Sequence, residues 1–432
     1  MKRPRNIRYL TVLSVALASV LVLGACSNSE TNTPATKPST IKVTLTTHPW
    51  TDAIEKLIPK FEAETGIKVD LTVYTRDQLD VKSNVQLNAG SSDLDVFMYN
   101  TLQAGPLYVQ NGWMADLSKF IKDDPSFGWS DFQAGPREAS TIDGKIYGVP
   151  INTDAGILFY NKKLLDAAGV AVPTTLKDLM AAAKALNKDG VAGIVMRGKL
   201  AQLVSPFSGF LYSYGGDFTD KSGNATLDTP EAIEAYKTYG SLLKDYGPKG
   251  VTDMGWPQAV PLFTSGKAAM YIDADSLFIN MTDPAQSSIA DSVGYASVPA
   301  GPAGSVTFNV PAWGLGINQG SKNKDAAWKF IEWASSKATT LITQGAGVPG
   351  ARTSAWASKE GTKAFPPELL QVLVEAQKTG VGHNRPEVVD GNLASEIVSG
   401  PIIAAINGGD VEAAAKKAQA DLEALIAKDK KK

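Results

Sequence analysis

The chain contains, at residues 143–169, the stretch DGKIYGVPINTDAGILFYNKKLLDAAG. Asp143-Gly144 lies between two short segments and is typical of a β-hairpin turn, because glycine supplies the positive φ that a type I′ turn needs. The run from Gly148 to Tyr160 predicts a long extended segment, and Lys163 to Ala168 predicts a helix. This stretch therefore predicts a turn, a strand and a helix in direct succession.

The residues before this stretch predict an α/β arrangement. Residues 41–47 alternate with β-branched side chains, and residues 51–65 place their apolar side chains on one helical face before Gly66 ends the helix. Residues 67–74 are again typical of a strand. A strand, a helix and a strand within about thirty residues form a βαβ unit. Together with a further strand at 94–99, this unit predicts an α/β first half with a mostly parallel sheet.

The residues after the stretch predict a second α/β series. Residues 176–186 indicate a helix, 192–196 a strand and 202–214 an aromatic helix. The segment 227–231, LDTPE, is typical of a helix start, with Asp228 or Thr229 as the cap and proline in the first turn. A chain of 432 residues that is 44% hydrophobic is long enough to fill two cores.

The N-terminus has the pattern of an export signal. Basic residues at 2–8 precede an apolar run at 9–22 and then Leu-Gly-Ala-Cys at 23–26. This ending resembles the bacterial lipobox, and the resemblance implies that residues 1–25 are removed and that Cys26 is lipidated. Because Cys26 is the single cysteine, no thiol remains for a disulfide or a cysteine-based site. The resemblance implies a cell-membrane lipoprotein on the extracytoplasmic face.

Composition limits the classes of partner. Residues 26–40 carry Ser, Thr and Pro but no large apolar residue, so they predict a flexible tether, and residues 428–432 predict a solvated basic tail. The net charge of the chain is -2, although the first 25 residues contribute only basic side chains. The remainder is therefore acidic, which argues against nucleic acid as a partner.

Several segments together resemble a known family. They are DLDVFMYN (93–100), NGWMADL (111–117), residues 143–169, FTSGKAAMYID (263–273), KNKDAAWKFIEWASS (322–336) and GVPGARTSAW (347–356). In this order they are similar to the extracellular solute-binding proteins of bacterial carbohydrate importers, the family that contains maltose-binding protein. WPQAVPLFTSGKAAMYIDA (256–274) and SVGYASVPAGP (292–302) most resemble the branch that imports polyols and small α-glucosides.

The resemblance implies a two-lobed α/β fold with a ligand cleft between the lobes. Crossing segments are expected near 150–154, 309–313 and 348–352. One lobe then comprises residues 41–151 and 310–349, and the other comprises 152–309 and 350–427. Hinge closure over a carbohydrate or polyol would be followed by delivery to the permease subunits of an ABC transporter. The family further implies a monomer that is not an enzyme and needs no cofactor or metal.

Sugar chemistry and strand ends indicate the first candidate residues. A sugar presents hydroxyls at its edge and C–H groups on its faces, so its site needs planar polar groups and aromatic rings. Open α/β sheets bind ligands at the carboxyl ends of strands. Trp50 follows the first predicted strand, and Tyr99 and Asn100 follow the strand at 94–98. We expect these three to face the ligand, with packing of Trp50 under the next helix as the alternative and His48 as a loop hydrogen bonder.

The expected crossings and cleft segments contribute the other candidates. Asn152 and Asp154 lie in the first crossing, where hydrogen bonding within the hinge is the alternative role. Four more lie in segments that approach the cleft in the family: Trp256, Asp273, Trp313 and Arg352. The Arg352 guanidinium is expected either to bind two sugar hydroxyls or to pair with Asp154 or Asp273.

The sequence also allows three other functions. An exported glycoside hydrolase would use paired acids such as Asp95, Asp154 and Asp273. However, the sequence has no Gly-x-Ser-x-Gly, no His-Glu-x-x-His and no glycine-rich phosphate loop, and it has only two histidines. An anionic solute such as glycerol phosphate, held at helix N-termini, is a second alternative. Calcium binding by Asp273-Ala274-Asp275 is a third, although the rest of a calcium loop is lacking.

Overall fold

The computed structural model describes residues 39–430, which fold around a seven-stranded mixed sheet. The strand order is β2-β1-β3-β9-β6-β7, and β8 also pairs with β6. Their bounds are β1 Thr40–Thr46, β2 Lys68–Tyr74, β3 Val96–Asn100, β6 Val149–Asn161, β7 Met270–Ala274, β8 Val293–Ser297 and β9 Asn309–Ile317. Strand β1 pairs in parallel with β2 and β3, whereas β9 is antiparallel to β3 and β6 is antiparallel to β7, β8 and β9. The predicted βαβ unit is therefore present, and the parallel part of the sheet is limited to three strands.

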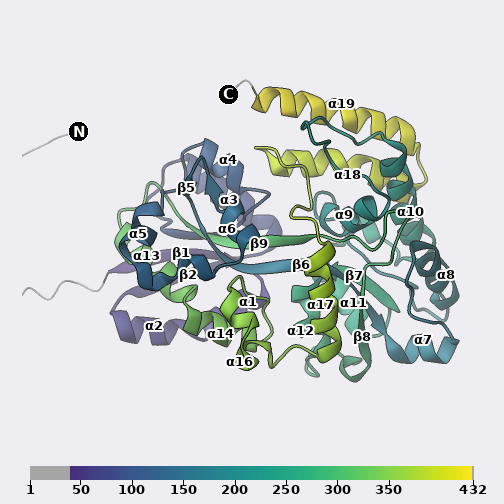
Figure 1. Ribbon diagram of the computed structural model, residues 1–432, viewed down its shortest axis with the longest axis horizontal. Coiled ribbons are helices and arrows are strands. Elements are labelled where there is room, and N and C mark those ends of the chain that lie inside the picture. Colours follow the sequence, from purple (N-terminus) through teal and green to yellow (C-terminus); the bar gives the residue numbers. More distant parts are fainter. Residues whose placement is uncertain (1–38, 431–432) are drawn as a thin grey trace, which may run out of the picture. The chain divides into compact units, whose positions relative to one another are not determined.

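Strands β6 and β9 pass from one hydrophobic core to another. The first core contains Val149 and Ile151 at the start of β6, and it contains Leu315 near the end of β9. The opposite ends of the two strands enter two further cores, which contain Ile157 and Val310. Figure 1 shows β6 and β9 running side by side between the two groups of helices that cover these cores.

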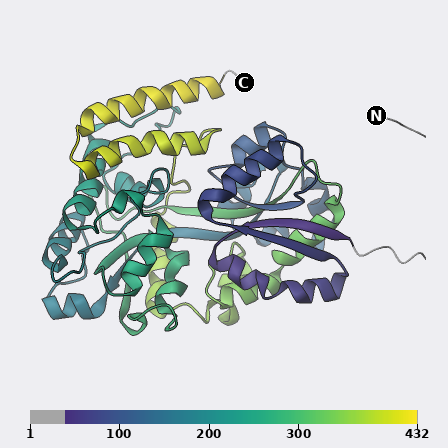
Figure 2. The same ribbon diagram turned by 180° about the vertical axis from the view of Figure 1, so that it is seen from behind.

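The helices divide between these cores. Those of the first group are α1 Pro49–Glu55, α2 Ile58–Thr65, α3 Arg76–Asn88, α4 Gly105–Gln110, α5 Ser118–Asp123, α6 Ala134–Ala139, α13 Lys324–Ala334 and α14 Lys337–Gly345. Those of the second group are α7 Lys162–Ala168, α8 Leu176–Leu186, α9 Val204–Ser213, α10 Pro230–Tyr246, α11 Trp256–Thr264, α12 Phe278–Thr282, α17 Pro367–Thr379, α18 Gly391–Asn407 and α19 Val411–Asp429. Two short helices, α15 Thr353–Trp356 and α16 Lys359–Thr362, lie between α14 and α17. Helices α18 and α19 pack against each other, as Figure 2 shows from behind.

Local sequence signals placed several elements correctly. Strands β4 (Thr141–Ile142) and β5 (Lys145–Ile146) form the expected hairpin, in which Asp143 has φ 50° and Gly144 has φ 73°. The Thr229 side chain caps α10, with proline in the first turn as predicted. The strand predicted at 192–196 is wrong, because only Ala192 and Val195 form isolated bridges. The intervening Ile194 N–H turns away and donates to the Tyr246 carbonyl at 3.3 Å.

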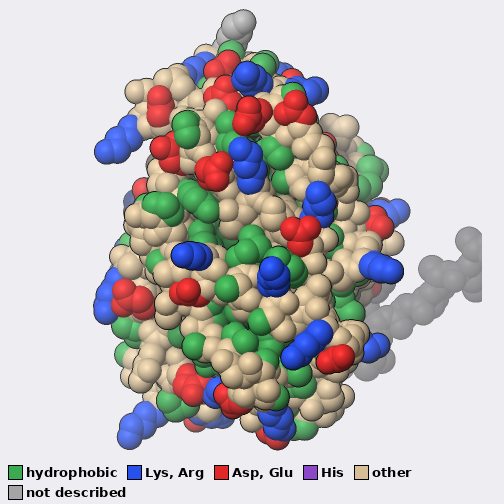
Figure 3. Space-filling model, turned by 90° about the vertical axis from the view of Figure 1, so that its right-hand side faces the viewer, with side chains coloured by type: hydrophobic (Ala, Val, Ile, Leu, Met, Phe, Trp, Pro, Cys, Tyr) green, Lys and Arg blue, Asp and Glu red, His purple; other side chains and the backbone are tan. Residues whose placement is uncertain are grey.

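The surface of the molecule carries charges of both signs. Figure 3 shows acidic and basic side chains intermingled over one face of the molecule. Within residues 39–430, no helix has both the length and the apolar content that crossing a bilayer requires. The predicted signal peptide, Cys26 and all but the last residues of the tether lie outside the described part of the chain. Helix α19 continues to Asp429, so Lys428 lies in its last turn rather than in a tail.

Candidate functional site

A cavity of about 360 Å³ lies where β6 and β9 pass between the cores. Its lining comes from both groups of elements. The first group contributes the loop before α1, the exposed face of α3, the end of β3 and the middle of β9. The second group contributes residues 197–205, the start of α11, the turn after β7, the loop before α18 and the first turns of α18. Side chains far apart in sequence therefore converge on one polar space.

Four of the predicted ligand residues line this cavity. They are Asn100 at the end of β3, Asp154 on β6, Trp256 at the start of α11 and Trp313 on β9. The amide oxygen of Asn100 accepts a hydrogen bond from the Gln103 backbone N–H at 2.9 Å, which fixes the turn that follows β3. The strand ends and the β6 segment thus bring predicted residues together at one place.

Three other predicted residues do not line the cavity, because the adjoining core takes their side chains. Trp50 is 1% exposed and packs in the first core, which was the alternative considered for it. Tyr99 packs against Phe97 and Tyr108, with ring centroids 5.9 and 6.4 Å away. Asn152 is fully buried beside the cavity lining, and its amide nitrogen lies 3.4 Å from Asp154 Oδ1. Tyr99 and Asn100 are neighbours on β3, so their side chains point to opposite faces of the strand. Trp50 lies in α1, and Asn152 lies at a register shift of β6.

Arg352 also lies away from the cavity, and the expected pairing with Asp154 or Asp273 is wrong. Its guanidinium pairs with Asp131 at 3.2 Å and donates to the carbonyls of Ser335 and Phe127 at 2.7 and 2.9 Å. It also lies over the Phe132 ring, 4.0 Å from the centroid. The isolated bridge between Phe132 and Arg352 holds the backbone in this place, so Arg352 joins two segments of the first group.

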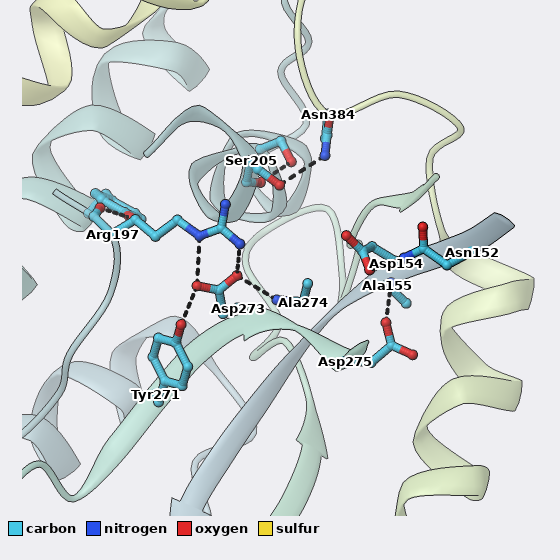
Figure 4. A network of polar contacts seen from close by, with 12 residues as sticks. Asn152, Asp154, Ala155, Arg197, Ser205, Tyr271, Asp273, Ala274, Asp275 and Asn384 are labelled. Atoms are coloured by element: carbon cyan, nitrogen blue, oxygen red, sulfur yellow. Dashed lines mark hydrogen bonds and ion pairs between the residues drawn. The ribbon is translucent and has the colours of Figure 1, made fainter. Parts of the chain in front are cut away.

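Asp273 is fully buried and acts on the cavity through Arg197. The Arg197 guanidinium forms a two-pronged ion pair with the Asp273 carboxylate, with Nε to Oδ2 at 2.8 Å, and Arg197 lines the cavity. Tyr271 O–H and the Ala274 backbone N–H also donate to this carboxylate, as Figure 4 shows. Burial opposes the charge of Arg197, but Asp273 outweighs it and raises the pKa of the guanidinium. Asp273 is therefore a positioning residue for Arg197.

The sequence reasoning missed several polar residues of the lining. They are Arg76, Asp80, Gln103, Arg197, Asn384, Arg385 and Asn392. Arg197 directly follows the segment predicted as a strand at 192–196, so the strand-end rule applied elsewhere would have found it. Asn384 and Arg385 lie in the loop between α17 and α18, which carries no strand signal. Their position in the cavity depends on the path of this loop, which packing between distant segments determines.

The indole of Trp313 is enclosed by polar groups. The Arg76 guanidinium lies 4.8 Å from the centroid of the Trp313 ring, and the His48 ring lies 6.1 Å away. Arg76 is held in place by Asp80 at 3.0 Å and by Gln103 at 3.0 Å. Burial lowers the pKa of His48 to about 3, and its Nδ1 accepts from the Trp50 backbone N–H. His48 is therefore neutral, and its other ring nitrogen carries the proton.

Two carboxyl groups near β6 are desolvated. Asp275 accepts from the Ala155 backbone N–H at 2.7 Å and is almost fully buried, which raises its pKa well above the usual range. Burial raises the pKa of Asp154 to about 6, with a further rise from Asp273, although Ser276 and Arg197 oppose the shift. Figure 4 shows the two side chains on opposite sides of the strand. Asp154 thus changes between a donor and an acceptor near neutral pH.

Replacing Asp154 with asparagine is expected to change the free energy of unfolding more favourably at neutral pH than at acid pH. The folded state binds this proton more tightly than the unfolded chain, so the free energy of unfolding falls as pH rises from about 4 through 6. Asparagine does not ionise, so the variant does not lose this part of its stability as the pH rises. Urea unfolding of both proteins at about pH 4.5 and pH 7.5 measures the effect. The difference, variant minus wild type, should be larger at the higher pH, and an equal difference at both values would contradict the assignment.

The described residues contain no group of three or more His, Cys, Asp or Glu side chains arranged to hold a metal ion. Asp273 and Asp275, the acids of the calcium alternative, bind different partners. Asp273 binds Arg197, and Asp275 binds the Ala155 backbone. The calcium alternative therefore has no support in this part of the chain.

Comparisons with known proteins agree with this fold. A family model described as bacterial extracellular solute-binding protein matches residues 47–340. The erythritol/L-threitol-binding protein of Mycolicibacterium smegmatis is 27% identical over 78% of this chain and 78% of its own length. The mannitol-binding protein of Pseudomonas aeruginosa is 28% identical over 68% of this chain and 69% of its own.

A solved structure has the same fold. The ABC transporter solute-binding protein of Agrobacterium radiobacter K84, in complex with ribitol, superimposes with a TM-score of 0.82. It is 25% identical and covers 90% of this chain and all of its own. The mixed α/β fold is thus that of the periplasmic binding proteins, and the family binds solutes rather than converting them. This chain belongs to the family of bacterial extracellular solute-binding proteins.

Proposed function

We propose that this chain is the substrate-binding lipoprotein of an ABC importer and that it captures a small carbohydrate or polyol in the cavity. The observation that carries the proposal is a set of buried polar atoms on the cavity lining that have no hydrogen-bond partner among residues 39–430. They are Asn84 Oδ1, Gln202 Oε1 and Arg385 Nη1. Buried polar atoms are normally satisfied, and a solute with several hydroxyls both donates and accepts.

The size and lining of the cavity support a small polyhydroxylated solute. About 360 Å³ lies at the lower end of the roughly 300–1,000 Å³ of ligand pockets. The Trp256 ring can cover C–H groups, whereas Trp313 is already faced by Arg76. The relatives that bind erythritol, mannitol and ribitol point in the same direction. The solute would then pass to the permease subunits of the importer.

We further propose that the two lobes close over the solute. The boundaries are those expected above, with residues 41–151 and 310–349 in one lobe and 152–309 and 350–427 in the other, except that Ala351 and Arg352 pack with the first lobe and move this boundary beyond 352. Two observations support this proposal. Along β6, Ile151 packs in the first core and Ile157 packs in another. Contacts between side chains on either side of the cavity are the second observation. Asp77 pairs with Lys199, and Gln103 donates to Asn392. These contacts join the two groups of elements across the cavity.

Replacing Trp256 with alanine is expected to weaken solute binding by about tenfold or more, because the ring is lost from the cavity wall. Thermal-shift and calorimetric titrations with erythritol, ribitol, mannitol and maltose measure the effect. A solute at about 100 times its Kd should stabilise the wild type by about 2.7 kcal/mol. Trp113→Ala is the matched control, since Trp113 is also half-buried but packs on Tyr108 outside the cavity. Equal losses for the two variants, or no binding by the wild type, would refute the proposal.

A further inference from the structure

Arg385 is a buried cation whose charge has no ion-pair partner among the described residues. It lies in the loop between α17 and α18, is 5% exposed and lines the cavity. Its Nε donates to the side-chain oxygen of Asn384 at 3.0 Å, a neutral group. Its Nη1 is buried and has no hydrogen-bond partner in residues 39–430. A guanidinium in this state is costly unless an anion compensates it.

The other two arginines of the cavity are already paired. Arg76 binds Asp80 at 3.0 Å, and Arg197 binds Asp273. Burial, together with the charges of Arg76 and Arg197, lowers the pKa of Arg385 to about 9, although Asp80 and Tyr212 oppose the shift. Since Asp80 is engaged by Arg76, the side of the cavity near Arg385 carries one uncompensated positive charge.

A neighbouring pocket does not account for this charge. Arg385 also borders a second pocket of about 560 Å³, between α6 and the loop at 383–389. That pocket has three acids in its lining, Glu138, Glu387 and Asp429, against Lys430 and a histidine, His383, that is already bound to Asp217. The acids outnumber the remaining cations, which disfavours an anion there. The remaining acids of the first cavity are Asp77, which pairs with Lys199, Asp154 on β6 and Glu396, which is exposed on α18.

We propose that the solute is a polyhydroxylated acid whose carboxylate or phosphate group binds Arg385. This inference rests on the proposed function and narrows its substrate class. The guanidinium offers a planar pair of donors that matches an oxyanion, and charge-assisted bonds of this kind are about twice as strong as neutral ones. Asp154, Asn100 and Gln202 are left to bind the hydroxyls. The loop at 383–392 is thus the part of the fold that selects the acidic end of the solute.

Matched probes on one carbon skeleton test this inference. Calorimetry at about pH 7.5 would compare ribitol, mannitol and glucitol with ribonate, mannonate and gluconate, and with the phosphate monoesters of the same polyols. The best acid should bind the wild type at least about tenfold more tightly than its neutral counterpart. The carboxylate and phosphate series together show which oxyanion is preferred. Because the comparison uses the wild type, it holds even where a variant fails to fold.

Two variants at Arg385 distinguish the effect of its positive charge from the effect of its planar pair of donors. Arg385→Met should abolish the preference, so that the acid binds no more tightly than its neutral counterpart, and Arg385→Lys should retain a part of the preference. Neutral polyols binding as tightly as both acid series would overturn the inference and leave the proposed function intact. No binding by any probe at millimolar concentration would overturn both. An acid preference that survives Arg385→Met would also overturn the inference.

Discussion

Replacing Arg352 with methionine is expected to lower the free energy of unfolding by about 3–5 kcal/mol and to leave solute affinity unchanged. The guanidinium is 1% exposed and joins Asp131 to the carbonyls of Ser335 and Phe127. Methionine keeps the apolar stem, but it leaves these acceptors without a donor. Burial lowers the pKa of Arg352, while Asp131 counteracts the shift, so the pair is a desolvated one. Urea unfolding and solute titration of the same preparations measure the two effects.

Lys337→Met provides the control for this prediction. Lys337 lies beside Gly128, close to the Arg352 guanidinium, but its side chain is exposed. Its loss should change stability by no more than about 0.5 kcal/mol. If the folded Arg352→Met protein lost solute affinity while keeping its stability, Arg352 would belong to the binding site after all.

Replacing Asp273 with asparagine is expected to lower both stability, by about 3 kcal/mol, and solute affinity, by about tenfold. The carboxylate is fully buried, and its loss leaves the Arg197 guanidinium without its counter-charge. Affinity falls because Arg197 lines the cavity and depends on Asp273 for its orientation. Denaturant unfolding and calorimetric titration with the best solute test the two parts.

A double-mutant cycle distinguishes this positioning role from a general loss of packing. Arg197→Met combined with Asp273→Asn should be less destabilised than the sum of the single variants, because no unpaired charge remains. Asp291→Asn, which breaks an exposed pair with Lys163, should have an effect within about 0.5 kcal/mol. Additive losses in the cycle would show that Asp273 and Arg197 act independently.

The fold could be predicted from sequence where local patterns are strong. The hairpin at Asp143-Gly144, the long β6 and the cap at Thr229 all follow from short-range physics that the sequence displays. The segment at 192–196 has the composition of a strand, yet it forms only two bridges. Its backbone partners come from segments distant in sequence, which local patterns do not encode.

The site could be predicted only in part, for a related reason. A strand end pointed to Asn100, and the family resemblance pointed to Asp154, Trp256 and Trp313. The structure brings these four residues to one cavity. Arg352 and Asp273 are charged residues in the right segments, but their partners turn out to be Asp131 and Arg197. Whether a charged side chain faces a cavity or a buried partner depends on packing between distant segments. The same limit applies to Arg385, because its loop between α17 and α18 is placed at the cavity by packing between distant segments.

The most direct test is a crystal structure of residues 39–432 with the tightest-binding solute from the titrations. The account predicts that the solute lies in the cavity between the cores, with hydroxyls bound to Asp154 and one face against Trp256. A solute bound at another place, or within the cavity but out of contact with both residues, would contradict it.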